Sequence, residues 1–190
     1  IKLVFEWLEK SVKTADPEAR EKMHNASTMA GMAFANAFLG MSHSMAHKIG
    51  GVHHTVHGRT NAILLPYVIR YNGTRPSKTT TWPKYNYWKA DEKFQDIAKM
   101  LGLPHSTPEE AVEAYAKAVY ELGVAVGIKM NFKDQGIDEK AWKDSLHEIA
   151  LLAYEDQCSP ANPRLPMVAD MEEIMADAYY GYAERPGRRK

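Results

Sequence analysis

The chain has 190 residues, and its 24 basic side chains balance 24 acidic ones, so the formal net charge is zero. This balance provides no strongly basic surface for nucleic acid or for an anionic membrane. The longest apolar runs, such as residues 62–69, are far shorter than the roughly 20 residues that cross a bilayer, and the single cysteine, Cys158, cannot form an internal disulfide. We therefore expect a cytoplasmic protein with a small-molecule partner, and no nucleic acid or membrane partner.

The first forty residues predict two helices. Apolar side chains recur over residues 1–12 at the spacing of one buried helical stripe. Asp16, followed by a proline and a glutamate, can cap a second helix that we expect to run over residues 17–39 before Gly40. The abundance of Ala, Met and Gly in residues 26–37 predicts that this helix is packed closely on several sides.

The next segment predicts two helices separated by glycines. We expect residues 43–49 to form a short helix that ends at Gly50 and Gly51. Thr60 or Asn61 can cap the helix that follows.

The remainder of the chain predicts further helices joined by loops. Pro66 should kink or divide the helix that contains it, and residues 74–88 predict an irregular loop because they lack a helical period. Residues 158–166, with three prolines, predict another loop. Capping and spacing signals predict helices over residues 91–101, 107–126, 138–154 and 167–180. No segment shows the period-2 pattern of a strand, so the expected fold class is all-α.

Five of the eight histidines lie within residues 43–58. His43 and His47 are four residues apart, so on a helix they share a face that can bind a transition metal, or place one ligand beside a proton-transfer group. His57 can return to the same point if the chain doubles back at the two glycines. From spacing alone, His43 and His47 are the preferred metal pair. The alternative is that these histidines are structural side chains, satisfied by backbone or water.

Several short motifs around these histidines resemble one enzyme family. The motifs are GMAFAN at residues 31–36, GMSHSMAH at 40–47, HG at 57–58, NAILLP at 61–66 and RYN at 70–72. Together they resemble the helical domain of the iron-containing (group III) alcohol dehydrogenases. DQC at 156–158 and NPR at 162–164 bring the resemblance closer to the alcohol dehydrogenase half of the bacterial bifunctional aldehyde/alcohol dehydrogenases.

The resemblance implies a fold and a set of site residues. It implies the multi-helix half of a dehydroquinate synthase-like, two-domain alcohol dehydrogenase, with a helical metal-binding domain over residues 1–183 and a basic tail over 184–190. Carried over by position, the family pattern makes His43 and His57 the metal ligands, in place of the pair preferred from spacing. It places His47 beside the nicotinamide and the substrate as a catalytic residue that does not bind the metal. Phe34 would also lie near the nicotinamide.

The resemblance also implies cofactors and partners. The expected metal is Fe²⁺, with Zn²⁺ as an alternative, and the expected redox cofactor is NAD. The substrate would be a small alcohol or aldehyde, and the implied physiological direction is reduction of acetaldehyde to ethanol by NADH. The full-length enzyme is expected to form a homo-oligomer or a filament.

Two features of the family pattern are missing from the 190 residues. The family's other two metal ligands are an Asp and a His four residues apart on an earlier helix, and no Asp here precedes a His at that spacing. No Gly-x-Gly-x-x-Gly phosphate loop occurs either. Because the chain also begins at Ile1 with helical spacing, we expect a piece of a longer polypeptide, with its nucleotide-binding domain upstream, that is inactive alone. The alternatives are a single-function iron alcohol dehydrogenase, a zinc glycerol dehydrogenase relative, and a non-catalytic helical interaction domain.

Overall fold

The computed structural model describes residues 1–76 and 88–181, and all regular secondary structure in this part of the chain is helical. The helices are α1 (Lys2–Thr14), α2 (Pro17–Ala37), α3 (Met41–His53), α4 (His57–Gly73), α5 (Ala90–Met100), α6 (Pro108–Ala125), α7 (Glu139–Tyr154) and α8 (Val168–Tyr180), with a 3-10 turn at Ser159–Ala161. The predicted all-α class is confirmed. The expected basic tail, the end of the expected domain near residue 183 and most of the expected loop over 74–88 lie outside the described residues.

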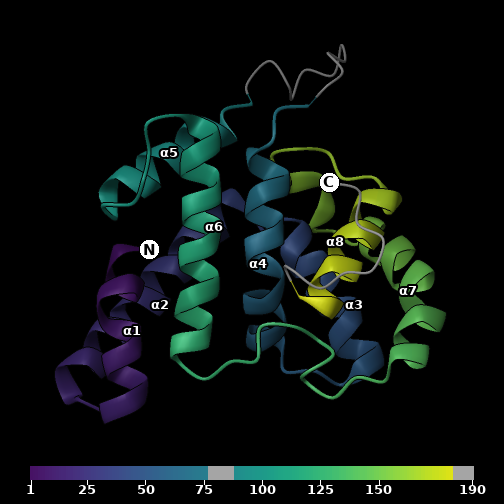
Figure 1. Ribbon diagram of the computed structural model, residues 1–190, viewed down its shortest axis with the longest axis horizontal. Helices are drawn as coiled ribbons and strands as arrows, with labels where there is room; N and C mark the ends of the chain where they lie inside the picture. The colour runs from purple at the N-terminus through teal and green to yellow at the C-terminus, as the bar shows by residue number, and fades with distance from the viewer. Residues whose placement is uncertain (77–87, 182–190) are drawn as a thin grey trace.

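Helix α4 stands in the middle of the molecule, beside α6 (Figure 1). Helices α1, α2 and α5 lie on the side of α6, whereas α3, α7 and α8 lie on the other side. A large hydrophobic cluster joins α3 and α4 to α7 and α8, and a smaller one joins α4 to α6. Gly73 permits the close approach of α4 and α6, because a Cβ at this position would lie 2.5 Å from Cγ2 of Val112.

One face of α3 is fully buried. Met41, Met45 and Ile49 recur every four residues and have no exposed surface. Burial of side chains of this size contributes about 1.5–3 kcal/mol each relative to exposure. His43 and His47 lie two residues further along the helix from this stripe, so the core fixes the rotation of α3 and turns their rings to another face.

The glycine pair does not end α3, contrary to the prediction. The helix continues through Gly50 and Gly51 to His53, and the reversal begins at His54, which has a left-handed φ of 54°. Each helical glycine costs about 1 kcal/mol relative to alanine. Tertiary contacts offset this cost, because the His53 ring stacks on Trp142 with centroids 5.3 Å apart.

The predicted cap of α4, Thr60 or Asn61, was four or five residues too late, because the observed cap is Val56. The helix begins at His57, and Thr60 is buried inside it, where its hydroxyl donates to the carbonyl oxygen of Val56 at 3.0 Å. Pro66 does not divide α4, which is one continuous helix to Gly73. The proline is buried in the packed centre of the fold, so tertiary packing holds the helix together on both sides of it.

Helix α2 is not packed closely on several sides, which corrects the prediction from its composition. It packs on α1, and its buried residues are Ala19 and Ala26. Met29 and Met32 are more than half exposed. Small and apolar side chains favour close packing against another surface. The composition of α2 does not indicate whether that surface lies within the same 190 residues.

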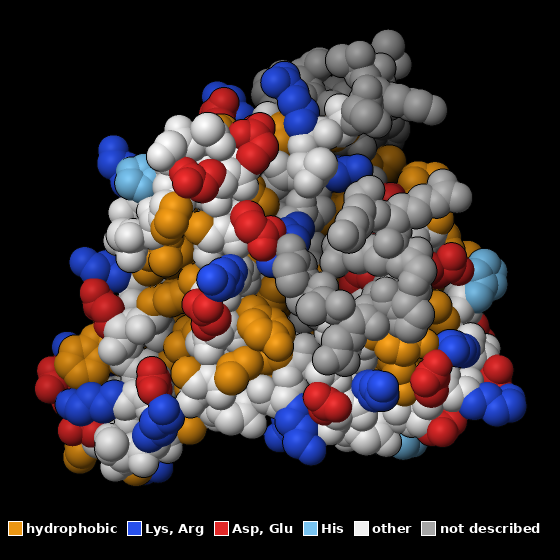
Figure 2. Space-filling view, in the orientation of Figure 1, with side chains coloured by type: hydrophobic (Ala, Val, Ile, Leu, Met, Phe, Trp, Pro, Cys, Tyr) orange, Lys and Arg blue, Asp and Glu red, His pale blue; other side chains and the backbone are white. Residues whose placement is uncertain are grey.

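Charged side chains of both signs are interspersed over the face drawn in Figure 2. None of the helices in the described ranges combines the length and the apolar composition that a membrane span requires.

Candidate metal and active site

Three imidazole rings converge where α3 meets α4. The His43 and His57 ring centroids are 5.3 Å apart, those of His47 and His57 are 5.4 Å apart, and those of His43 and His47 are 6.1 Å apart. His57 reaches the α3 rings because the chain reverses between the two helices. The structure therefore brings together the three histidines that the sequence singled out, although the reversal lies at residues 54–56 and not at the glycines.

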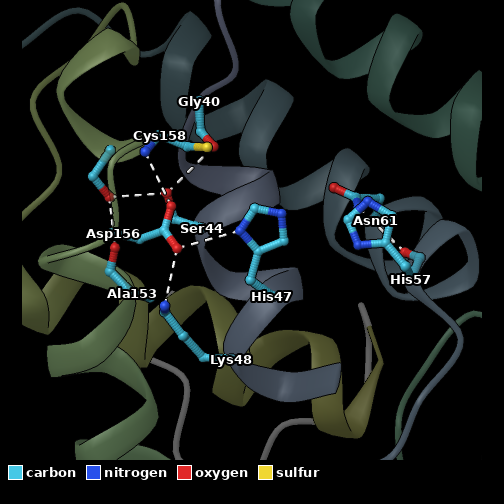
Figure 3. A network of polar contacts seen from close by, with 10 residues as sticks. Gly40, Ser44, His47, Lys48, His57, Asn61, Ala153, Asp156 and Cys158 are labelled. Atoms are coloured by element: carbon cyan, nitrogen blue, oxygen red, sulfur yellow. Dashed lines mark hydrogen bonds and ion pairs between the residues drawn. The ribbon is translucent and has the colours of Figure 1, made fainter. Parts of the chain in front are cut away.

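Asn61 joins the two helices that carry the rings. Its amide nitrogen donates to Nε2 of His57 and to the His57 carbonyl oxygen, both at 3.2 Å (Figure 3). Its carbonyl oxygen accepts a hydrogen bond from the Ser42 hydroxyl at 3.0 Å. Because an amide nitrogen only donates, Nε2 of His57 is an acceptor in this arrangement. Asn61 thus links α3, beside His43, to the first turn of α4.

The surroundings of His43 favour its neutral form. Desolvation lowers the pKa of His43 below the ordinary value of a histidine, and the neighbouring His57 and His47 lower it further. A neutral imidazole has the free lone pair that a transition metal binds. The side chains therefore fit a divalent metal by their donor type and by their convergence on two different helices. His43 offers a ring nitrogen directly, whereas Nε2 of His57 can bind a metal only when the metal displaces the Asn61 amide from that lone pair.

A buried carboxylate lies on the other side of His47. Oδ2 of Asp156 is 3.3 Å from Nδ1 of His47 and 3.0 Å from Nζ of Lys48 (Figure 3). Oδ1 of Asp156 accepts the backbone N–H of Cys158 at 3.0 Å. The Asp156 side chain is only 7% exposed. Burial acts to raise the pKa of this carboxyl, but the Cys158 N–H, Lys48 and His47 outweigh burial and hold the pKa well below its usual range. Asp156 is therefore ionised at neutral pH.

The same group does not favour a second metal. Ligand atoms of His47, Asp156 and Cys158 all lie within 4.8 Å of one another. However, the Lys48 ammonium already pairs with the carboxylate that a cation would need. Burial raises the pKa of the Cys158 thiol, and the neighbouring Asp156 raises it further, so the sulfur stays protonated. These features define a salt-bridged polar network and also argue against a nucleophilic Cys158.

Asn162 holds the segment after Asp156 against the start of α3. This fully buried side chain exchanges two hydrogen bonds with the amide of Asn72, donates to the carbonyl oxygen of Arg164 at 2.6 Å, and accepts the backbone N–H of Met41 at 3.3 Å. A Cβ at Gly40 would lie 2.8 Å from Oδ1 of Asn162, so glycine permits this close approach. Asn162 thereby fixes the loop of Asp156 relative to the helix of His43 and His47.

We expect Asn162→Ala to lower the free energy of unfolding by about 3 kcal/mol, because it leaves buried partners without hydrogen bonds. Urea unfolding followed by circular dichroism measures the change. Asn36→Ala is the matched control: Asn36 is exposed and bonds only one turn back to Met32, so its loss should cost less than about 0.5 kcal/mol. Equal stability of the two variants would contradict the anchoring role of Asn162.

The other candidates occupy separate places. Phe34 lies in the last turn of α2 and is 47% exposed. His53 donates to or accepts from the Ser145 hydroxyl of α7 at 3.0 Å, and His54 forms the left-handed cap of α3. His53 and His54 therefore serve the packing and the reversal of α3, while His43, His47 and His57 form the cluster.

Sequence reasoning had not assigned a role to Asp156 or Lys48. Asp156 entered only as part of the DQC motif, and it lies 109 positions after the histidine that it contacts. No local spacing connects residues so far apart. The available signal was the motif itself, an acid set between a helix and a proline-rich loop.

The described residues form an all-helical domain. The imidazoles clustered where α3 meets α4 can supply nitrogen ligands to a transition metal, so the domain is of a metal-binding class. Residues 1–179 match the model of the Fe-containing alcohol dehydrogenase family, C-terminal. The chain belongs to this family as its C-terminal helical domain, which confirms the resemblance found in the sequence motifs.

Individual relatives agree with this assignment. The chain is 80% identical over 190 residues to an aldehyde-alcohol dehydrogenase of Streptococcus pneumoniae serotype 2 (strain D39 / NCTC 7466), covering all of this chain and 22% of the relative. It is 60% identical over 183 residues to aldehyde-alcohol dehydrogenase 2 of Entamoeba histolytica, covering 96% of this chain and 21% of the relative. An iron-containing alcohol dehydrogenase structure from Thermococcus thioreducens superposes with a TM-score of 0.76 at 35% identity, covering 95% of this chain and 42% of that one. The chain thus spans about a fifth of the length of these two curated relatives.

Proposed function

We propose that these 190 residues are the metal-binding helical part of an iron-dependent, NAD-linked alcohol dehydrogenase that interconverts acetaldehyde and ethanol. The observation that carries the proposal is the convergence of His43 and His57, whose ring centroids are 5.3 Å apart on two different helices. The aldehyde-alcohol dehydrogenases at 80% and 60% identity support a bifunctional enzyme. Zinc, and a single-function enzyme, remain the alternatives to test.

In this proposal, His43 and His57 hold the metal. Neutral imidazoles suit Fe²⁺ and also Zn²⁺, so donor type alone does not select between them. The bound metal supplies a Lewis acid that stabilises negative charge on the alcohol oxygen. Catalytic sites generally use at least three protein ligands, so groups outside these two residues complete the site.

His47 is the proposed catalytic residue. During alcohol oxidation, the hydroxyl proton passes to a ring nitrogen of His47, and the carbon donates a hydride to the nicotinamide of NAD. The products are the aldehyde, NADH and one proton, and the same steps in reverse reduce the aldehyde. Phe34, exposed at the end of α2, offers an apolar ring that can pack beside the nicotinamide. Positioning of this kind holds the hydride donor and acceptor in a reactive geometry.

The test uses the full-length polypeptide, loaded without oxygen with Fe²⁺ or with Zn²⁺. We expect NADH consumption with acetaldehyde in the iron form, and NAD reduction with ethanol. A coenzyme A-dependent aldehyde oxidation in the same polypeptide would support the bifunctional form, and its absence would favour the single-function enzyme. Activity with glycerol and zinc alone would favour the glycerol dehydrogenase alternative. If the full-length protein shows neither metal binding nor turnover, the result would favour the non-catalytic helical interaction domain.

The expected homo-oligomer or filament stays a prediction for the full-length enzyme. Negative-stain electron microscopy of the purified full-length protein checks it directly, and a monomer at micromolar concentration would contradict it.

A further inference from the structure

The buried carboxylate of Asp156 lies beside His47, the proposed catalytic residue. Metal binding by His43 and His57 does not account for this contact. Asp156 follows α7, whereas His47 belongs to α3, and the two are joined through Nδ1 of the histidine at 3.3 Å. The carboxylate is 7% exposed, while the His47 side chain is 35% exposed. A charged group is thus held inside the protein with one oxygen aimed at Nδ1 of a histidine whose side chain remains partly exposed.

The chemistry of the pair fixes which nitrogen carries the proton. An ionised carboxylate only accepts hydrogen bonds, so Nδ1 of His47 is the donor. In the neutral imidazole, Nε2 is then the nitrogen with the free lone pair. Nε2 lies across the ring from Asp156, and the ring itself stacks on His57 with an interplanar angle of 18°.

Other contacts hold the carboxylate still. Lys48 pairs with the same oxygen that faces His47, and the backbone N–H of Cys158 binds the other oxygen at 3.0 Å. The adjoining turn is tied to α3 by a hydrogen bond from the Ser159 hydroxyl to the Ser44 hydroxyl at 3.0 Å. The carboxylate therefore cannot turn away without breaking contacts to α3 and to its own loop.

We propose that Asp156 is the positioning residue of His47, and that it orients the ring and selects the tautomer in which Nε2 takes the proton of the substrate hydroxyl. This inference deepens the proposed function and rests on it, since it requires His47 to act on the substrate. In the oxidation direction the proton leaves the hydroxyl for Nε2, the hydride leaves for NAD, and the Asp156 carboxylate offsets the positive charge that the ring gains. Asp156 itself neither binds the metal nor touches the substrate.

The test is a double-mutant cycle in the full-length, metal-loaded enzyme with the variants Asp156→Asn, His47→Ala and the pair together. An amide can donate to Nδ1 as well as accept from it, so it no longer selects the tautomer. We expect Asp156→Asn to lower kcat at least about 10-fold and to change KM for the alcohol less than about 3-fold, in line with losses caused by groups that orient an active-site histidine. In the His47→Ala background, the same change should alter kcat less than about 2-fold.

Two further measurements separate positioning from a structural role. The metal content per chain of Asp156→Asn should match that of the parent enzyme. The variant should still unfold in one cooperative transition, at a melting temperature lowered by the lost ion pair with Lys48. Glu172→Gln is the matched control, because Glu172 accepts from Nδ1 of His147 at 2.6 Å, and that histidine is 79% exposed. Its kcat should stay within about 2-fold of the parent value.

The outcomes distinguish this inference from the function on which it rests. A parent enzyme without alcohol dehydrogenase activity would overturn the proposed function and this inference with it. A fully active His47→Ala variant would leave the alcohol dehydrogenase function standing but would overturn the catalytic role of His47, and with it this inference. An active parent, an impaired His47→Ala variant and a normal Asp156→Asn variant would overturn the positioning role alone. An equal loss of kcat from Asp156→Asn in both backgrounds, or a loss of metal, would also overturn it, because Asp156 would then act independently of His47.

Discussion

Replacing His43 or His57 with alanine is expected to abolish metal binding in the full-length enzyme, whereas replacing His47 is expected to leave the metal in place and to lower turnover. His43 and His57 come from two helices, and each supplies one of the few nitrogen ligands available, so loss of either should weaken metal binding more than about 100-fold. His47 contacts Asp156 through Nδ1 and is proposed to move a proton, a contribution worth about 100- to 10,000-fold in rate.

Elemental analysis after desalting, together with kcat for ethanol oxidation, measures both effects. His147→Ala is the matched control, since His147 lies on α7, is exposed and is remote from the cluster in sequence. Circular dichroism should show that every variant melts close to the parent. Metal loss in the His47 variant, with metal retained in the His43 variant, would reverse the assigned roles.

Local signals predicted most helix starts, because capping depends on residues within one turn. Asp16, Thr107 and Asp138 each accept a hydrogen bond from the backbone three residues later, as their positions in the sequence indicated. The end of α6 near residue 125 and the start of α8 near residue 168 also follow the predicted spacing. These features need no knowledge of the rest of the fold.

Local sequence signals did not predict the features that depend on tertiary contacts. The glycines at 50 and 51 stay helical because α3 is anchored on both sides of them, by Ile49 in the core and by the ring of His53 on Trp142. The apolar residues of α2 gave the same pattern that a buried helix gives, although much of their surface is uncovered in these 190 residues. The exposure of a helix depends on what lies beside it, which its own composition does not contain.

The candidate site also has a part that local sequence signals predicted and a part that depends on tertiary contacts. The i, i+4 spacing of His43 and His47 predicted a shared face, and the convergence of His57 followed from a chain reversal somewhere after α3. The choice between His47 and His57 as the second ligand came from the family resemblance and not from geometry. The contact between His47 and Asp156 joins α3 to the segment after α7, so only the folded chain reveals it.

The isolated 190 residues are expected to fold without retaining iron and without oxidising alcohol. A cluster of fully buried side chains joins α3, α4, α7 and α8, which supports independent folding. Two imidazoles leave a divalent iron mostly hydrated, and such an ion exchanges readily with solvent. The domain should therefore unfold cooperatively in urea, yet hold well below one iron per chain after gel filtration.

Iron analysis and an ethanol oxidation assay with NAD on the same preparation check both parts of this prediction. The His43→Ala variant of the 190 residues is the control for adventitious metal, and its iron content should equal that of the parent chain. Tight, stoichiometric iron that His43→Ala removes would show that further ligands lie within these residues. In that case His47, the nearest additional imidazole to His57, would become the first candidate for a third ligand, and its proposed role in proton transfer would have to be abandoned.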